Sequence, residues 1–434
     1  MSVARAGITF WADEMIADYL AMLRRFERNV RLYLVAGGVL GFTTAGGVFA
    51  VLMNLYVLRL GFDIQFVGLL NFCGAFSFAF CSFLAGTIGR RWGPRRSMVL
   101  GILFIAVGNA TLPAAELVAE AWRAEFLLVT RLPRAFGFAL FHVNANPFLM
   151  EATGPSERTH VFSVQAAFWS LAAFCGSLFG GLMPGFFAEL TGRGTSDPEP
   201  YRYALVVATL MLLPAAAVMA RARETGAVQS AEVKSGDGDR PTVLIAVIAI
   251  AAFFLFSGAT GVQVFFNVYL DEELEVDTVL IGTVQAVAHL LAGLAALATP
   301  LIAGRWGHVR TITWGSVGAI LCLVPLVLST DWRLAGLGFM ALSALGTIRY
   351  AAMSVYQQEM VKARWRSQMS VAVSMAGGLS FSSVPLAGGF LIAAGGYQSF
   401  FLMSSVLSVV GILTFWLYFR TPRGEYRGAA ERVC

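Results

Sequence analysis

The stretch Gly86-Thr-Ile-Gly-Arg-Arg-Trp-Gly-Pro-Arg-Arg96 returns in altered form as Pro300-Leu-Ile-Ala-Gly-Arg-Trp-Gly-His-Val-Arg310. Within it, Arg91, Trp92, Gly93 and Arg96 each recur 214 positions later. A repeat with a fixed long period indicates one structural unit that occurs twice. The same shift relates residues outside this stretch, namely Gly68 and Gly282, Asn71 and Gln285, and Gly101 and Gly315.

The repeat extends well beyond this stretch. Glu151 and Arg158 return as Glu359 and Arg366 at a shift of 208. The pattern Asn54-x-Tyr56 returns as Asn267-x-Tyr269. Each unit therefore takes up about half of the chain, and two parallel repeats of apolar segments are typical of secondary transporters.

The composition is that of a membrane protein. Of 434 residues, 57% are hydrophobic and 13% are charged, and the mean hydropathy is +0.71. A helix needs about 20 mostly apolar residues to cross the hydrocarbon core of a bilayer. The sequence predicts an all-α polytopic membrane protein, with twelve transmembrane helices in two pseudo-symmetric six-helix halves. The twelve apolar stretches begin near Tyr33, Gln65, Ser97, Ala124, Val161, Tyr201, Thr242, Thr278, Thr311, Trp332, Met369 and Tyr397.

This pattern divides the chain into five segments. Residues 1–30 are expected to form a cytoplasmic amphipathic leader, and a merely polar leader is the alternative. Residues 31–220 form the first six-helix half and residues 242–420 the second. The polar, glycine-containing residues 221–241 are predicted to be a cytoplasmic linker, and residues 421–434 a cytoplasmic tail.

The arginines and lysines predict the orientation. With a cytoplasmic N-terminus, 23 of the 31 fall in inner segments, 5 in outer loops and 3 within spans. This distribution obeys the positive-inside rule, with both termini cytoplasmic in an inner or plasma membrane. The net charge of +5 follows from this topology, so we expect no nucleic-acid partner.

No sequence pattern indicates an enzyme, a cofactor or a metal. Four of the five cysteines lie within predicted spans and have no zinc-type spacing. Neither a nucleotide-binding loop nor a His-Glu-x-x-His or Gly-x-Ser-x-Gly motif occurs. Transport energy is therefore expected from an ion gradient, such as a proton gradient, or from the gradient of the solute itself.

The paired basic loops and the twelve spans resemble the major facilitator superfamily over residues 31–420. In that family the loop between helices 2 and 3 reads Gly-x-x-x-Asp-Arg-x-Gly-x-Arg-Arg. In this chain Arg90 replaces the acid, and its counterpart in the second loop is Gly304. The five positions that match the family pattern are Gly86, Arg91, Gly93, Arg95 and Arg96.

The resemblance implies a gating role for these loops. Their arginines are expected to hold the inner helix ends when the inner gate is shut, and Arg305, Gly307 and Arg310 act likewise in the second half. Either a different partner replaces the missing aspartate, or the closed state is held less tightly. Glu151 and Glu359 are candidates, because each lies seven residues before an arginine, Arg158 and Arg366 respectively. The alternative is that these charges only determine topology.

Three arginines are predicted to lie inside spans. Arg131 and Arg134 fall in the fourth span and Arg349 in the tenth, and no acid lies equally deep. A buried ion in a bilayer is costly and usually has a function. These guanidiniums would bind a carboxylate or phosphate of the substrate. Alternatively they satisfy helix-end carbonyls, line water or reach acids at helix ends such as Glu151.

Further polar side chains fall in the spans and complete the predicted substrate set. His289, in the eighth span, could carry a proton, whereas His142 is more simply explained as a histidine hydrogen-bonded inside the bundle. Some of the amides must face a cavity, because the alternative is lipid. They are Asn54, Gln263, Asn267 and Gln285.

The sequence thus predicts a secondary active transporter of a small organic solute, in which two halves rock around a central site. The anionic substrate is one reading, and an exporter of cationic or neutral drugs is another. A membrane sensor or scaffold that binds without translocating is a third. We expect a monomer in the lipid bilayer.

Overall fold

The computed structural model describes residues 26–44, 46–153, 158–224, 241–328, 330–362 and 365–421. Every regular element in these ranges is a helix. Most of the leader, most of the linker and nearly all of the tail lie outside the described residues, so the predictions made for them stay predictions.

The first half contains six spans, because the first and sixth are each built from two helices. Hydropathy and length account for all of them, since each is long and apolar enough to cross a bilayer. The helices are α2 (Arg28–Thr43), α3 (Val48–Arg59), α4 (Ile64–Trp92), α5 (Pro94–Thr111), the short η1 (Pro113–Leu117), α6 (Glu120–Glu151), α7 (Arg158–Thr191), α8 (Pro198–Leu210) and α9 (Leu212–Ala220).

The second half repeats this arrangement with fewer breaks. Its last helix includes a candidate membrane segment of 52 residues, Gln368–Phe419. At 1.5 Å per residue this segment is about 78 Å long, enough to cross twice a hydrocarbon core of about 30 Å. The two crossings meet at Gly396, whose φ of +74° breaks the helix. The helices are α10 (Thr242–Glu272), α11 (Thr278–Trp306), α12 (His308–Leu328), α13 (Trp332–Glu359) and α14 (Arg366–Phe419).

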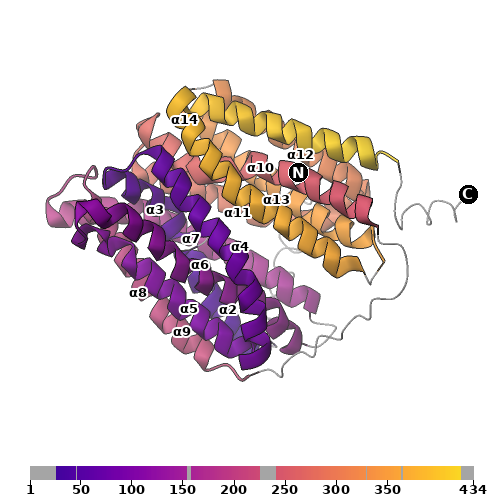
Figure 1. Cartoon of the computed structure of the whole chain (residues 1–434), viewed down its shortest axis with the longest axis horizontal. Helices are drawn as coiled ribbons and strands as arrows, with labels where there is room; N and C mark the ends of the chain where they lie inside the picture. The colour runs from indigo at the N-terminus through magenta and orange to yellow at the C-terminus, as the bar shows by residue number, and fades with distance from the viewer. Residues whose placement is uncertain are drawn as a thin grey trace, which may run out of the picture.

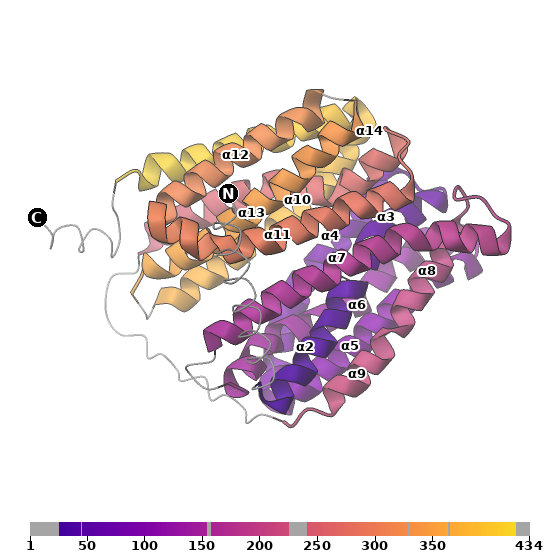
Figure 2. The same cartoon turned by 180° about the vertical axis from the view of Figure 1, so that it is seen from behind.

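The predicted twelve crossings in two halves are therefore present. The two halves lie side by side, in indigo to magenta and in orange to yellow (Figures 1 and 2). They contact each other through α4 with α14 and α7 with α11. We call the end at which α4 finishes and α10 begins the linker end, and the opposite one the far end.

Glycines allow the halves to touch near the far end. A Cβ on Gly181 would lie 2.9 Å from the Cα of Gly282, and a Cβ on Gly68 would lie 2.6 Å from the carbonyl oxygen of Pro385. Small residues of this kind let membrane helices approach closely. Toward the linker end the two groups of helices diverge (Figure 1).

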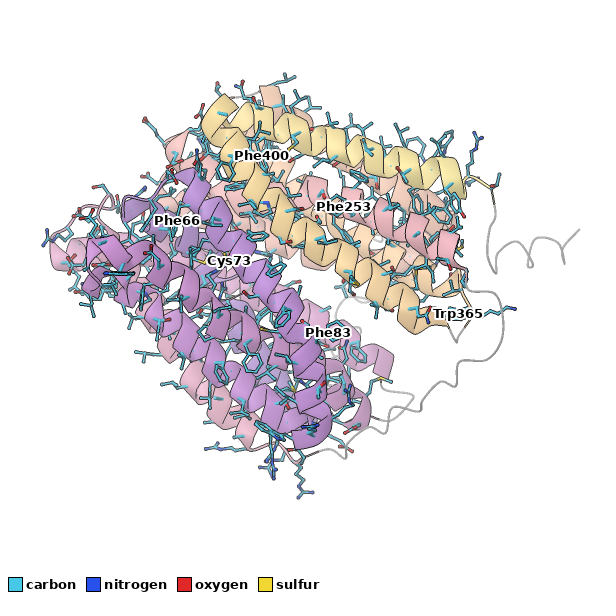
Figure 3. The ribbon with its side chains drawn as sticks, viewed as in Figure 1. Phe66, Cys73, Phe83, Phe253, Trp365 and Phe400 are labelled. Carbon is cyan, nitrogen blue, oxygen red and sulfur yellow. The ribbon has the colours of Figure 1, made fainter. Side chains whose placement is uncertain are left out.

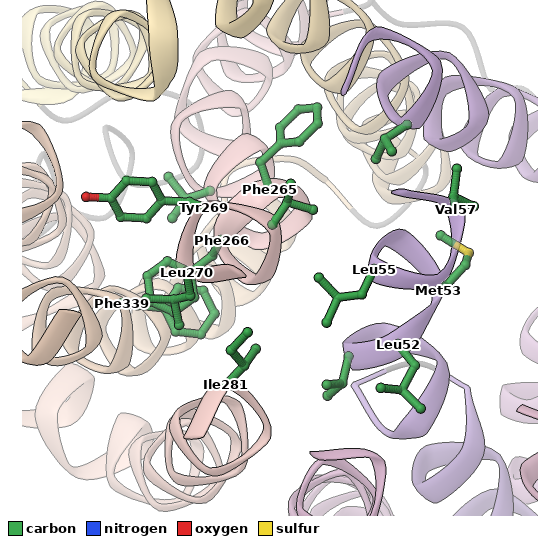
Figure 4. Close-up of a cluster of buried hydrophobic side chains, with 14 of the residues drawn as sticks. Leu52, Met53, Leu55, Val57, Phe265, Phe266, Tyr269, Leu270, Ile281 and Phe339 are labelled. Carbon is green, nitrogen blue, oxygen red and sulfur yellow. The ribbon is translucent and has the colours of Figure 1, made fainter. Parts of the chain in front are cut away.

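The hydrophobic cores follow the same division. One cluster contains buried residues from both halves, such as Leu52 and Leu55 of α3 beside Phe265 and Phe266 of α10 (Figure 4). Three further clusters each draw on a single half, around Phe148, Phe415 and Leu140. Among the described residues, the halves thus share a hydrophobic core in one region, at the far end. This shared core holds the far end together.

Candidate functional site

The first span is interrupted where it meets the second half. α2 ends at Thr43 and α3 begins at Val48, and Gly46 between them has a φ of +90°. A Cβ on Gly46 would lie 2.8 Å from Cε1 of His289. Ser177 donates a 2.6 Å hydrogen bond to the carbonyl oxygen of Gly46 and so satisfies a backbone group released by the break. The break brings His289 against the first span.

Arg131 and Arg134 of α6 converge on the thioether of Met53 in α3. Their Nη1 atoms lie 2.7 Å and 3.8 Å from the Sδ atom. The guanidinium carbon of Arg134 also lies 5.7 Å from the ring centroid of Phe49. A thioether is only a weak acceptor, and the buried Nε atoms of both arginines have no hydrogen-bond partner among the described residues. Both guanidiniums therefore keep donors for a stronger acceptor.

Small residues leave space for these two side chains. A Cβ on Gly74 of α4 would lie 2.8 Å from Nη2 of Arg131, and a Cβ on Gly108 of α5 would lie 2.6 Å from the backbone nitrogen of Arg134. Cys73 lies in the first half of α4, directly before Gly74, which packs against Arg131 (Figure 3). The cysteine thus provides a natural chemical probe beside the arginine pair.

Arg349 lies in α13, the counterpart of α6 in the second half. Its side chain is 4% exposed, and its Nε has no hydrogen-bond partner in the part of the chain that the structure describes. It packs opposite Gly315 of α12. None of the ion pairs formed by the described residues includes Arg131, Arg134 or Arg349. The three arginines thus come from both halves and have no acidic partner among the described residues.

The remaining predicted residues have different surroundings. His142 packs against aromatic rings, with centroids 4.1 Å from that of Phe138 and 5.4 Å from that of Trp169. Its buried Nε2 has no hydrogen-bond partner among the described residues. Gln285 is buried, whereas Gln263 is exposed. An aromatic pocket accounts for His142 without any role in binding.

Asn54 and Asn267 form a reciprocal pair of bonds between the halves. Nδ2 of Asn54 donates to the carbonyl oxygen of Val264 at 2.8 Å, and Nδ2 of Asn267 donates to that of Val51 at 2.8 Å. The donors Asn54 and Asn267 are 213 residues apart, and so are the acceptors Val51 and Val264. The two bonds therefore obey the symmetry of the repeat and join α3 to α10. Because these amides are used in this way, we leave both residues out of the proposed substrate set.

Two further contacts close the far end. Nη2 of Arg59 lies 2.7 Å from Oδ1 of Asp271, in an ion pair between the ends of α3 and α10. The hydroxyls of Tyr201 and Thr278 are 3.0 Å apart and join α8 to α11. These contacts were not predicted from the sequence. The acidic character of residues 271–277 was their only visible signal, and it does not reveal a partner.

The comparisons agree with this architecture. A model of the Major Facilitator Superfamily matches residues 34–358 and 248–433. The chain belongs to this superfamily. Comparison with curated protein sequences gives no match.

Solved structures of superfamily transporters share the fold at low sequence identity. The nucleoside transporter NupG has a TM-score of 0.69 at 12% identity, over 91% of this chain and 98% of its own. A bacterial homologue of the human lysosomal transporter Spinster, inward-facing and occupied, has 0.70 at 15%, over 90% and 96%. The xylose transporter XylE from E. coli, inward open, has 0.68 at 13%, over 89% and 94%.

The superfamily's basic loop makes its contacts within the first half. The backbone N–H and Nε of Arg95 donate 3.0 Å hydrogen bonds to the two carboxylate oxygens of Glu224. Nε of Arg96 lies 3.9 Å from Oε2 of Glu224. Arg91 is exposed, and Gly86 packs near Val143. Glu224 thus contacts the loop that lacks the family aspartate. This role of Glu224 was not predicted, because the whole of residues 221–241 was assigned to the linker.

The second loop is more open. Arg305 and Arg310 are exposed, and a Cβ on Gly307 would meet nothing within 4 Å. Nε2 of His308 lies 3.7 Å from Oε2 of Glu359. Both carboxylate oxygens of Glu151 are buried without a hydrogen-bond partner among the described residues. The side chains of Arg158 and Arg366 lie outside the described part, so their predicted contacts with these acids stay predictions.

Proposed function

We propose that this transporter moves a small organic anion by alternating access, and that Arg131, Arg134 and Arg349 bind it. One observation carries the proposal: three deeply placed guanidiniums have no acidic partner among the described residues. An unpaired intramembrane charge costs at least about 2.5 kcal/mol on insertion scales. A carboxylate or phosphate would supply the missing charge and a bidentate acceptor.

The arrangement of the halves supports an inward-open state. The far end is held by the shared core, the reciprocal asparagine bonds and the ion pair of Arg59, and the halves diverge at the linker end. The Spinster homologue and XylE are inward-facing and inward open, respectively. We take the linker end to be cytoplasmic, on the positive-inside rule. Trypsin should therefore cleave after Lys234 only from the cytoplasmic side, because Pro241 protects the bond after Arg240. Cleavage from outside would reverse this topology.

The coupling ion is the second element of the proposal. One of the structural neighbours is a D-xylose–proton symporter. His289 is the proposed proton carrier, because its ring packs beside the break at Gly46 in the other half. The basic loops are proposed as the gate of the linker end. In the outward-open state their arginines would meet acids such as Glu151, whose carboxylate has no hydrogen-bond partner among the described residues.

Substrate protection of Cys73 tests the binding site. The other four cysteines are replaced by serine, and the alkylation rate of Cys73 in the purified protein is measured with organic carboxylates, organic phosphates, neutral sugars and organic cations. We expect an anion to slow alkylation, because the anion would lie beside Arg131. Arg134→Lys should weaken this protection about tenfold, since lysine keeps the charge and loses the fork.

The matched control is Arg333→Lys, because Arg333 lies over Trp332 at the far end of α13 and outside the proposed site. It should leave the protection unchanged. Protection by cations or neutral drugs alone, with Arg134→Lys and Arg349→Lys behaving as wild type, would overturn the anion assignment and favour the drug exporter. Anion protection without any flux in proteoliposomes would instead favour the sensor or scaffold.

A further inference from the structure

A cavity opens at the linker end of the first half, beside the basic loop. It has a volume of about 430 Å³ and lies where α4, α5 and α9 end or begin. α5 and α9 lie next to each other in both views of the molecule (Figures 1 and 2). The residues that line it are Trp92, Arg95, Arg96, Val99, Leu100 and Ala220.

The loop beside the cavity carries a surplus of positive charge. Arg90, Arg91, Arg95 and Arg96 fall within seven positions. Among the described residues, the only acid in ion-pair contact with them is Glu224. It lies 3.0 Å from Nε of Arg95, whereas its distance to Nε of Arg96 is 3.9 Å and the Arg96 side chain is 67% exposed. One carboxylate thus faces several guanidiniums, and Arg96 is available to a second anion.

The cavity lies at the predicted boundary between bilayer and water. α4 ends at Trp92, which is 55% exposed, and tryptophan is enriched at the level of the lipid headgroups. From this boundary α5 continues into the apolar region, and its residues Val99 and Leu100 form part of the cavity wall. The cavity thus has a cationic rim and an apolar wall, which together match a molecule with an anionic head and an acyl chain.

We propose that this cavity binds one anionic phospholipid. Arg96, supported by Arg95, holds the phosphate in a charge-assisted fork, and the first methylenes of the acyl chains pack against Val99, Leu100 and Trp92. Basic pockets between membrane helices on the cytoplasmic side are suited to such headgroups. The site is separate from the proposed substrate site and does not depend on what the protein transports.

The second half provides an internal comparison. Its loop keeps Trp306, Arg305 and Arg310, but Gly304 and Val309 replace the counterparts of Arg90 and Arg95. A Cβ on Gly307 would meet nothing within 4 Å, whereas one on Gly93 would collide with Glu224. The second loop therefore has fewer charges, and among the described residues no acid packs against its glycine. Arg310→Gln is a matched control for Arg96→Gln, because both residues are exposed and occupy the same place in the repeat.

Native mass spectrometry of the purified, delipidated full chain tests the site. The probes are phosphatidylglycerol, phosphatidylcholine with the same acyl chains, and glycerol 3-phosphate. We expect one phosphatidylglycerol to bind more tightly than phosphatidylcholine. Arg96→Gln should weaken this binding about fivefold, the effect of one arginine near an anionic lipid. Arg310→Gln should leave it unchanged, and Trp92→Ala should weaken it without altering the headgroup preference.

Three outcomes would overturn the proposal. Equal binding of phosphatidylcholine and phosphatidylglycerol would remove the headgroup selectivity. Displacement of the lipid by an equal concentration of glycerol 3-phosphate would indicate a site for a free anion. An equal loss in Arg310→Gln and Arg96→Gln would indicate general attraction to basic loops. Thermal melting of each variant in detergent identifies any that fail to fold, and Arg96→Lys then replaces Arg96→Gln, with a smaller loss expected because the charge is kept.

Discussion

Gly93 and Gly307 have the same backbone conformation and different neighbours. Their φ and ψ angles are 88° and 153° for Gly93, and 77° and 157° for Gly307. This region is essentially restricted to glycine. Gly93 is packed against the carboxylate of Glu224, whereas the space around Gly307 is open. The repeat therefore preserves the turn, and among the described residues only the glycine of the first half packs against an acid.

Replacement of each glycine by alanine separates these two effects. Both variants should lose about 1–3 kcal/mol of local backbone stability. Gly93→Ala should also displace Glu224 and break its bonds to Arg95, so we expect it to reduce transport and thermal stability more than Gly307→Ala does. In a Glu224→Ala background the difference between the two should disappear. Wild-type transport by Gly93→Ala would refute a gating role for this turn.

At the scale of elements, α3 and α10 are the pair that joins the two halves. Each contributes an asparagine whose amide bonds to the backbone of the other helix. Nδ2 of Asn71 donates a 3.1 Å bond to Oδ1 of Asn54. In the second half, Gln285 takes the place of Asn71 and is buried, yet Oδ1 of Asn267 has no hydrogen-bond partner among the described residues. The two bonds between α3 and α10 thus follow the repeat, whereas the bond from Asn71 to Asn54 has no counterpart among the described residues of the second half.

Loss of either amide should favour opening of the far end. Interhelical hydrogen bonds in membranes average about 0.6 kcal/mol, so Asn54→Ala and Asn267→Ala should each shift the equilibrium about threefold. Spin labels on Glu189→Cys and Glu273→Cys, which are exposed on opposite halves, report the far-end distance in a background without native cysteines.

The control is Asn29→Ala, which removes bonds to Arg223 within the first half only. It should leave the far-end distance distribution unchanged. If both asparagine variants match wild type, the bonds between α3 and α10 do not hold this end closed.

The positions of the helices could be predicted from the sequence, because a span is set by the length of an apolar run. α10, α11 and α13 begin at the predicted Thr242, Thr278 and Trp332. The break at Gly46 was missed, since hydropathy stays high through it. The three arginines lie within helices long and apolar enough to span a membrane, as predicted. The bonds that Asn54 and Asn267 form between the halves were not predicted, because a single sequence does not reveal which helix face meets the other half.

At the scale of the whole molecule, the halves share a core at one end and have separate cores elsewhere. The proposed rocking motion would have to open the shared core, and the polar contacts across it would set how readily this happens. The ion pair of Arg59 and Asp271 is the strongest of these contacts, since its exposed fractions are only 22% and 7%.

A double-mutant cycle on Arg59→Gln and Asp271→Asn measures this contact. We expect a coupling of about 1–2 kcal/mol in favour of the closed far end, between the values for exposed and buried pairs. The spin-label distance described above is the readout. Arg193→Gln, which removes the contact of Arg193 with Glu199 inside the first half, should show no coupling to Asp271→Asn. An absent coupling between Arg59 and Asp271 would remove this ion pair from the gate.

Flux of organic anions into proteoliposomes is the most direct test of whether the three arginines bind a transported anion. Labelled carboxylates, phosphates, neutral sugars and organic cations are offered to vesicles with wild-type protein, with Arg131→Gln/Arg134→Gln/Arg349→Gln, and with Arg333→Gln as control. We expect uptake of at least one anion by wild type and Arg333→Gln, and a loss of about tenfold or more in the triple variant. Uptake confined to cations or neutral solutes, at equal rates in the triple variant, would contradict this expectation.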